Sequence, residues 1–337
     1  MSDKIAQSDI DGYGFNISKS FEHTVYSEFV SEYLPVMTRR ARRWQQVIGN
    51  KNSIAKSGTV KRFCRKGIPS AERPKAWMCL SGANERMKNN PHLYQQMLEM
   101  DHNKELVDTI TLDIHRTFPD NRYFASNQSA TSLQKPLFNI LIAVGHRNRT
   151  IGYCQGMNFV AGLLLLVMKS EDSYEEKVFW LMDTLINNIL PEYFHPDMHA
   201  VKLDQEVLGE LVRWKAPDIY HHLELQGLSW CLIGMKWFIC LFADVLPVDT
   251  VLRIWDCLFN EGQKILMRAS LVIILSNRDK ILRCTNFSEV TDLFKETVLG
   301  KESLHCHSFL HSMFKDIGSL PMARINKLRR LCESKVV

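Results

Sequence analysis

The sequence of 337 residues lacks the short motifs that mark most self-contained catalysts. It contains no Gly-x-x-x-x-Gly-Lys-Ser/Thr phosphate loop, no dinucleotide-binding fingerprint and no Gly-x-Ser-x-Gly nucleophile turn. None of its nine cysteines is followed six residues later by an arginine, as a cysteine-phosphatase loop requires. We therefore expect a protein that is not an enzyme with an active site of its own.

Apolar runs long enough for a membrane span are missing as well. The run at 157–168 is too short to cross a bilayer, which needs about 20 apolar residues. The longer run at 228–248 is interrupted by Lys236 and Asp244 and is closed by Pro247. The first residues, Met-Ser-Asp-Lys, lack the positive-then-apolar pattern of a signal peptide, and no lipidation motif is present. These features predict a cytoplasmic protein that is not an integral membrane protein.

The net charge and the distribution of cysteines are both ordinary. The first bears on the kind of partner, and the second on the cellular compartment. The formal net charge of +5 is mild, and no basic-aromatic module is present, so we expect no nucleic-acid partner. The cysteines are scattered within apolar patterns, which is typical of reduced, buried thiols in the cytosol. His195 with His199, and His305 with His307, lack a third ligand at matching spacing, so no metal site is predicted.

Helical periodicity recurs along the chain and predicts an all-α protein. We expect an N-terminal arm and helix at 1–58, a core domain at 59–265 and C-terminal helices at 266–337 that complete a second helical subdomain. The first helix carries a basic cluster at 39–43, with arginines at 39, 40, 42 and 43. Such a cluster is either a solvated helix face or a patch for an anionic membrane.

Residues 110–121 contain the first candidate site. An apolar helical face leads into them, and Asp113 lies three residues before Arg116, so the two side chains are neighbours on the helix surface. Pro119 biases Phe118 away from helical geometry, which places Arg116 in the last turn. Two interpretations follow: a surface ion pair at a helix end, or a guanidinium held ready for a phosphate on another molecule.

A second candidate site lies at 152–156, where two glycines bracket Tyr153, Cys154 and Gln155. The glycines indicate a tight turn before a buried helix, and the turn presents the Gln155 amide at the mouth of that helix. Cys154 is a poor candidate nucleophile because its apolar flank indicates a buried thiol.

Two further segments are predicted to be structural. In 65–82, Ser70 is expected to cap a helix that ends at Gly82. Arg73 looks exposed in this helix, but we expect it to be structural, either paired or stacked on Trp77 four residues later. In 246–262, Asp249 or Thr250 is expected to cap a core helix that ends near Gly262.

Taken together, four blocks resemble the TBC-domain family of Rab GTPase-activating proteins. They occur in the order typical of that family and cover roughly residues 67–262. The blocks are Gly-Ile-Pro at 67–69 with Arg73 and Trp77; Ile110-x-x-Asp113-x-x-Arg116-Thr-Phe-Pro; Tyr153-Cys-Gln155-Gly156-Met-Asn; and Leu-Pro at 246–247 with Arg-Ile-Trp255-Asp256. The resemblance implies two packed helical subdomains, the first of which holds both candidate sites.

The resemblance also implies roles for individual residues. Arg116 corresponds to the arginine finger and Gln155 to the glutamine finger, with Asp113 orienting the arginine. Supporting positions are Tyr153, Gly156 and Asn121, and structural positions are Arg73, Trp77, Trp255 and Asp256.

The implied partner is a Rab-family small GTPase in its GTP form, which itself carries the GTP and Mg²⁺, so that this chain needs no cofactor. The implied setting is vesicle trafficking, with transient association with endomembrane surfaces through the partner. Two alternatives stay open: an adaptor that docks a Rab without accelerating hydrolysis, and a membrane-surface protein that works through the basic cluster. The presence of both finger residues argues against the adaptor.

Overall fold

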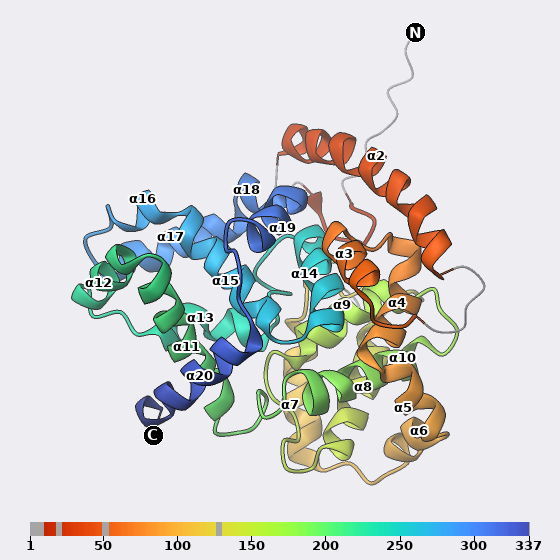
Figure 1. The fold of residues 1–337 in the computed structure, drawn as a ribbon. Helices are drawn as coiled ribbons and strands as arrows, with labels where there is room; N and C mark the ends of the chain where they lie inside the picture. The colour runs from red at the N-terminus through yellow and green to blue at the C-terminus, as the bar shows by residue number, and fades with distance from the viewer. Residues whose placement is uncertain (1–9, 18–21, 49–53, 126–129, 337) are drawn as a thin grey trace.

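The computed structural model describes residues 10–17, 22–48, 54–125 and 130–336. Over these residues the protein is all-α, as the sequence predicts, and its extended pairing is limited to two isolated bridges, Ile10 with Asn16 and Phe15 with Asn121. The helices form two packed groups, which lie on the right and on the left in Figure 1. No helix in the described parts of the chain is both long and apolar enough to cross a membrane.

The first subdomain is built around three mutually packed helices, α8, α9 and α10. These have long apolar faces that are almost fully buried, which supplies the main driving force for this half of the fold. Its elements are η1 (Ser70–Glu72), α4 (Arg73–Ser81), α5 (Ala83–Asn89), α6 (Leu93–Leu98), α7 (Lys104–His115), α8 (Gln134–Arg147), α9 (Met157–Met168), α10 (Tyr174–Thr184) and the π-helical turn η2 (Leu185–Ile189).

The second subdomain packs α11 against α12, α13, α15 and α20. Its elements are α11 (His199–Lys215), α12 (Pro217–Leu225), α13 (Trp230–Ile239), α14 (Val248–Glu261), α15 (Lys264–Ser276), α16 (Arg278–Ile281), α17 (Phe287–Leu299), α18 (Lys301–Leu304), α19 (Cys306–Phe314), α20 (Met322–Cys332) and η3 (Glu333–Lys335). The expected division at 265/266 falls inside α15.

Helix α14 joins the two subdomains. It packs on α15 and α19 on one side and on α3 (Gly58–Lys66) and α4 on the other. Every residue from Asp249 to Asn260 is buried, including four charged or amide side chains. A helix buried all round must place its polar groups against specific partners, which makes α14 the main determinant of how the two subdomains fit together.

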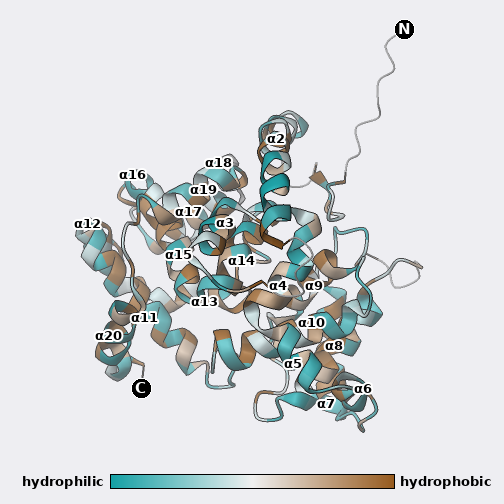
Figure 2. Ribbon diagram, turned by 45° about the vertical axis from the view of Figure 1, so that its right-hand side comes forward, coloured by the Kyte–Doolittle hydropathy of each residue, from teal (hydrophilic) through white to brown (hydrophobic). Residues whose placement is uncertain are grey.

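The N-terminal region contacts both subdomains: Phe29 packs with Leu304 and Cys306 of the second, and Phe15 pairs with Asn121 of the first. Helix α2 (His23–Ile48) projects at the top of Figure 1, and Figure 2 shows much of its ribbon as hydrophilic, consistent with a largely exposed helix. The described arm residues, 10–17, run beside the segment that follows α7. Parts of the expected arm, linker and loop lie outside the described residues, at 1–9, 18–21, 49–53 and 126–129.

Two expected helix caps are wrong, and one is confirmed. Ser70 begins the short 3₁₀ turn η1, and α4 starts three residues later without a side-chain cap. Helix α14 follows Pro247, and neither Asp249 nor Thr250 caps it, because both residues already lie within the helix. Gly82 does end α4 in the left-handed conformation, with φ of 90°.

Candidate functional site

Arg116 is the C-cap residue of α7, one position beyond the last turn in which the sequence placed it. Its side chain is 55% exposed, and its guanidinium pairs with the carboxylate of Asp113, which is almost fully buried. Phe118 then takes a left-handed conformation, with φ of 47°, and its ring packs edge-on against Phe15 with centroids 5.2 Å apart. The helix therefore stops sharply, and Arg116 is anchored at its base while its head faces solvent.

Gln155 occupies the turn between α8 and α9 and is exposed. Gly156 follows it with φ of 111°, a conformation that favours glycine. A Cβ at Gly156 would lie 2.3 Å from Cγ2 of Ile239 at the end of α13, so only glycine fits. The glutamine turn is consequently seated directly against the second subdomain.

Hydrogen bonds tie the two candidate segments together. The Tyr153 hydroxyl donates to Oδ2 of Asp113 at 2.5 Å, so the carboxylate that holds Arg116 is itself held by the glutamine turn. The Thr117 hydroxyl donates to the Asp113 carbonyl at 2.7 Å and accepts from Nδ2 of Asn158 at 2.8 Å. Oδ1 of Asn158 in turn accepts from the Gly156 amide at 3.0 Å. Arg116 and Gln155 thus project from one connected network.

Sequence reasoning assigned no role to Thr117 or Asn158, although both lie in the candidate motifs. Both are fully buried, and they link the segments through side-chain atoms. The available signal was the polar Asn158 in the first turn of an otherwise apolar helix. A buried amide needs partners, so its position predicted a hydrogen-bonded role but not the identity of its partners.

Burial raises the pKa values of two side chains in the glutamine turn, Tyr153 and Cys154. Burial and the neighbouring Asp113 raise the pKa of Tyr153, so the hydroxyl stays a hydrogen-bond donor at neutral pH. Burial also raises the pKa of Cys154 to about 11, which keeps it a thiol and argues further against a nucleophilic role.

Asn121 supports the turn after Arg116 from the N-terminal side. It is fully buried, and its Nδ2 donates to the Tyr13 carbonyl at 3.1 Å while its Oδ1 accepts from the Tyr123 amide at 3.0 Å. Asn121 also forms the backbone bridge with Phe15. The arm is therefore part of the architecture around Arg116.

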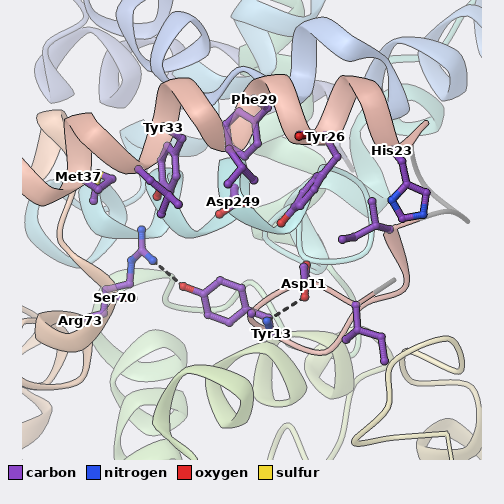
Figure 3. Close-up of a pocket in the computed structure, with 16 residues that line it drawn as sticks. Asp11, Tyr13, His23, Tyr26, Phe29, Tyr33, Met37, Ser70, Arg73 and Asp249 are labelled. Carbon is purple, nitrogen blue, oxygen red and sulfur yellow. Dashed lines mark hydrogen bonds between the residues drawn. The ribbon is translucent and has the colours of Figure 1, made fainter. Parts of the chain in front are cut away.

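The four residues expected to be structural gather at α4 and α14, apart from this network. Oδ1 of Asp256 accepts from Nε of Arg73 at 3.1 Å and from Nε1 of Trp77 at 3.0 Å, and Trp255 donates to the Leu241 carbonyl at 2.9 Å. The far side of the Arg73 guanidinium donates to the Tyr13 hydroxyl at 2.8 Å, as Figure 3 shows.

Of the two structural contacts expected for Arg73, the structure has pairing rather than stacking on Trp77, and the exposed appearance of Arg73 in the sequence is wrong. Arg73 is 1% exposed and forms a buried ion pair instead. Helical spacing identified Trp77 as a neighbour, but the stronger partner, Asp256, is 183 residues away in sequence. A buried guanidinium needs a carboxylate more than it needs an aromatic face.

The two histidines at 195 and 199 each contact a separate carboxylate. His195 contacts Asp197, and His199 contacts Glu333. Within the described ranges, no group of three or more histidine, cysteine, aspartate or glutamate side chains is placed to hold a metal ion.

Comparisons with known proteins identify the family and the fold. The sequence profile of the Rab-GTPase-TBC domain matches residues 70–282. Growth hormone-regulated TBC protein 1-A of Danio rerio is 46% identical over 328 residues, covering 97% of this chain and 91% of that protein. Growth hormone-regulated TBC protein 1 of Homo sapiens is 45% identical, covering 97% of this chain and 96% of that protein. The crystal structure of the Chlamydomonas flagellar RabGAP TBC domain superposes with a TM-score of 0.77 at 27% identity, covering 90% of this chain and 98% of that domain.

Proposed function

This chain belongs to the Rab-GTPase-TBC domain family, and we propose that it activates a Rab-family GTPase by supplying Arg116 and Gln155 in trans. Membership of the family supports a GTPase-activating function exerted on a partner. The proposal goes further by naming two residues and giving each a separate chemical role. This part of the proposal rests on the local geometry.

One observation carries the proposal: two exposed, chemically different side chains project from a single buried network. Asp113 holds Arg116 and is held by Tyr153, two residues before Gln155. The network fixes the bases of both side chains before a partner arrives. Such preorganisation is what electrostatic catalysis requires, because the groups need not reorganise when charge develops.

The chemistry of the two side chains suits phosphoryl transfer to water. A GTPase alone hydrolyses GTP slowly because the charge that develops on the transferred phosphoryl oxygens is poorly stabilised. An arginine finger raises the rate by about 10³ to 10⁵ through its bidentate charge. A neutral amide such as that of Gln155 both donates and accepts hydrogen bonds, so it orients water without adding charge.

The partner in this proposal is a Rab in its GTP form, and the partner brings the nucleotide and Mg²⁺. Hydrolysis then takes place on the partner at an interface that this chain completes. We place the protein in the cytoplasm, with contact to endomembranes made through the partner.

The proposal is tested by phosphate release from a panel of GTP-loaded Rabs with wild-type protein and the Arg116→Ala, Arg116→Lys and Gln155→Ala variants. We expect Arg116→Ala to lower the stimulated kcat by about 10³ or more, because the transition-state charge loses its partner. Lysine retains the positive charge but lacks the planar, bidentate guanidinium. Arg116→Lys should therefore recover only a small part of the stimulation. Gln155→Ala should also lose most of the stimulation.

Arg149→Ala is the matched control, because Arg149 is an exposed arginine in the same region with no ion pair among the described residues. It should change KM at most. Pull-down of the GTP-loaded Rab separates catalysis from docking. Full stimulation by Arg116→Ala protein would refute the finger assignment, and a wild-type chain that binds a Rab without accelerating hydrolysis would make it an adaptor.

A further inference from the structure

A cationic pocket of about 300 Å³ lies between α2 and α3, separate from the finger network. We call it the α2–α3 basic pocket. Its lining includes three arginines and a lysine, with aromatic side chains as its apolar wall: Arg39, Arg40, Arg43, Lys66, Trp44 and Phe63.

The pocket has a fixed shape because Trp44 fastens α2 to the end of α3. Trp44 is 1% exposed, its Nε1 donates to the Gly67 carbonyl at 2.9 Å, and its ring lies 5.9 Å from that of Phe63. Gly67 is itself packed against α14, since a Cβ there would lie 2.5 Å from Nε of Arg253. Arg39 and Arg43 are four residues apart on one face of α2, so both side chains are directed to the same side of this anchored helix.

The described part of the chain does not compensate the positive charge of the pocket. Within the described residues, no ion pair involves Arg39, Arg40, Arg43 or Lys66. The nearby carboxylate of Glu261 is already shared by three other cations, namely Lys61, Arg65 and Lys264.

Arg40 gives the clearest indication that the pocket lacks an anionic partner. It is half-buried, and its one recorded contact is a weak one from Nη1 to Sδ of Met37 at 3.7 Å. Burial and the neighbouring Arg253 lower the pKa of Arg40 to about 10, which shows how poorly its charge is solvated. A cation withdrawn from water normally has an anionic partner, and the described chain does not provide one.

We propose that the α2–α3 basic pocket binds the phosphorylated headgroup of an anionic lipid. Guanidinium forks match phosphate oxygens bidentately, and 300 Å³ falls at the lower end of the range for small-molecule sites. The exposed Arg42 and Arg62 nearby would meet the surrounding lipid surface. A nucleic acid fits less well, because its backbone is bound along an extended basic stripe rather than in one pocket.

The test is sedimentation of the full chain with vesicles at about 0.15 M salt. Three compositions are compared: phosphatidylcholine alone, phosphatidylcholine with phosphatidylserine, and phosphatidylcholine with phosphatidylinositol 4-phosphate at matched surface charge. We expect the tightest binding to the phosphoinositide vesicles. The double substitution Arg39→Gln with Arg43→Gln should weaken this binding by about tenfold or more, and Lys66→Gln, on the other helix, by about fivefold.

The matched control is Lys327→Gln with Arg330→Gln on α20, which removes the same two positive charges from exposed positions at the other end of the molecule. It should bind as the wild type does. The substituted side chains are all exposed, so we expect unchanged melting temperatures. Unchanged melting temperatures would show that the variants are folded.

Wild-type binding by the Arg39→Gln/Arg43→Gln variant would overturn the proposal, as would an equal loss in the α20 control, which would indicate general surface charge. Equal binding to phosphatidylserine vesicles would exclude a headgroup site. Binding of soluble inositol phosphate or duplex RNA, lost in the pocket variants without any vesicle binding, would assign the pocket to those ligands instead.

Discussion

Arg73 and Arg116 illustrate how environment decides what an arginine does. Both pair with an aspartate, but Arg73 is 1% exposed and the side chain of Arg116 is 55% exposed. The guanidinium of Arg73 donates to Asp256 and Tyr13 and is buried, so an external ligand does not reach it. Arg116 keeps just over half of its side-chain surface in solvent, and its ion pair among the described residues is with Asp113. The residue type is the same in the two cases, and exposure separates them.

Asp249 yields a prediction about pH and stability. It is buried in the first turn of α14, beside the cavity under α2 seen in Figure 3, and burial raises its pKa to about 6. The folded state therefore binds this proton more tightly than the unfolded state, and stability is lost as pH rises from about 4 to about 6. We expect Asp249→Asn to raise the free energy of unfolding at pH 7 by at most about 3 kcal/mol, with little change at pH 4.

Thermal denaturation at pH 4, 5.5 and 7 measures this effect. Asp292→Asn is the control, because Asp292 is exposed and pairs only with Lys295, so its effect should be small at every pH. A lower melting temperature for Asp249→Asn at pH 7 would mean that the carboxylate stabilises the fold, contrary to the prediction.

At the scale of elements, the glutamine turn depends on one close contact between subdomains. Gly156→Ala would place a methyl group 2.3 Å from Cγ2 of Ile239 while forcing a non-glycine residue into a φ of 111°. Overpacking and backbone strain together should destabilise the fold by about 2–4 kcal/mol and displace Gln155, with loss of stimulated hydrolysis.

Gly152→Ala is the matched control in the same turn. Gly152 also has a positive φ, of 60°, but a Cβ there would meet nothing within 4 Å. Only the conformational penalty of about 1–2 kcal/mol should apply, and stimulation should persist. Urea denaturation and phosphate release measure both quantities. Equal behaviour of the two variants would show that contact with Ile239 does not position the turn.

At the scale of the whole molecule, the ion pair between Arg73 and Asp256 fastens α4 to α14 and, through Tyr13, to the arm. Arg73→Ala leaves the buried Asp256 carboxylate with only the more distant Arg253, at 3.8 Å, as countercharge among the described residues, and we expect a loss of about 3–5 kcal/mol in the free energy of unfolding. Arg278→Ala, which removes an exposed partner of Asp218, should lose at most about 1 kcal/mol. A comparably small loss for Arg73→Ala in urea denaturation would contradict this role.

The sequence by itself determined the all-α class and most helix positions. It also determined the helix end that carries Arg116 and the turn that carries Gln155. These features depend on local interactions: apolar periodicity, a proline after Phe118, and glycines at 152 and 156. The family resemblance supplied the expected roles of both side chains, which the structure leaves as proposals.

Only the tertiary structure decided how those local pieces are joined. Asn158 meets Thr117 across 41 residues, Arg73 meets Asp256 across 183, and Gly156 is pressed against Ile239 of the other subdomain. The same holds for the α2–α3 basic pocket, where Lys66 joins arginines from another helix. Periodicity and spacing describe neighbours along the chain, whereas the partners of buried polar groups are chosen by packing, because each must be satisfied by whatever the fold brings within reach.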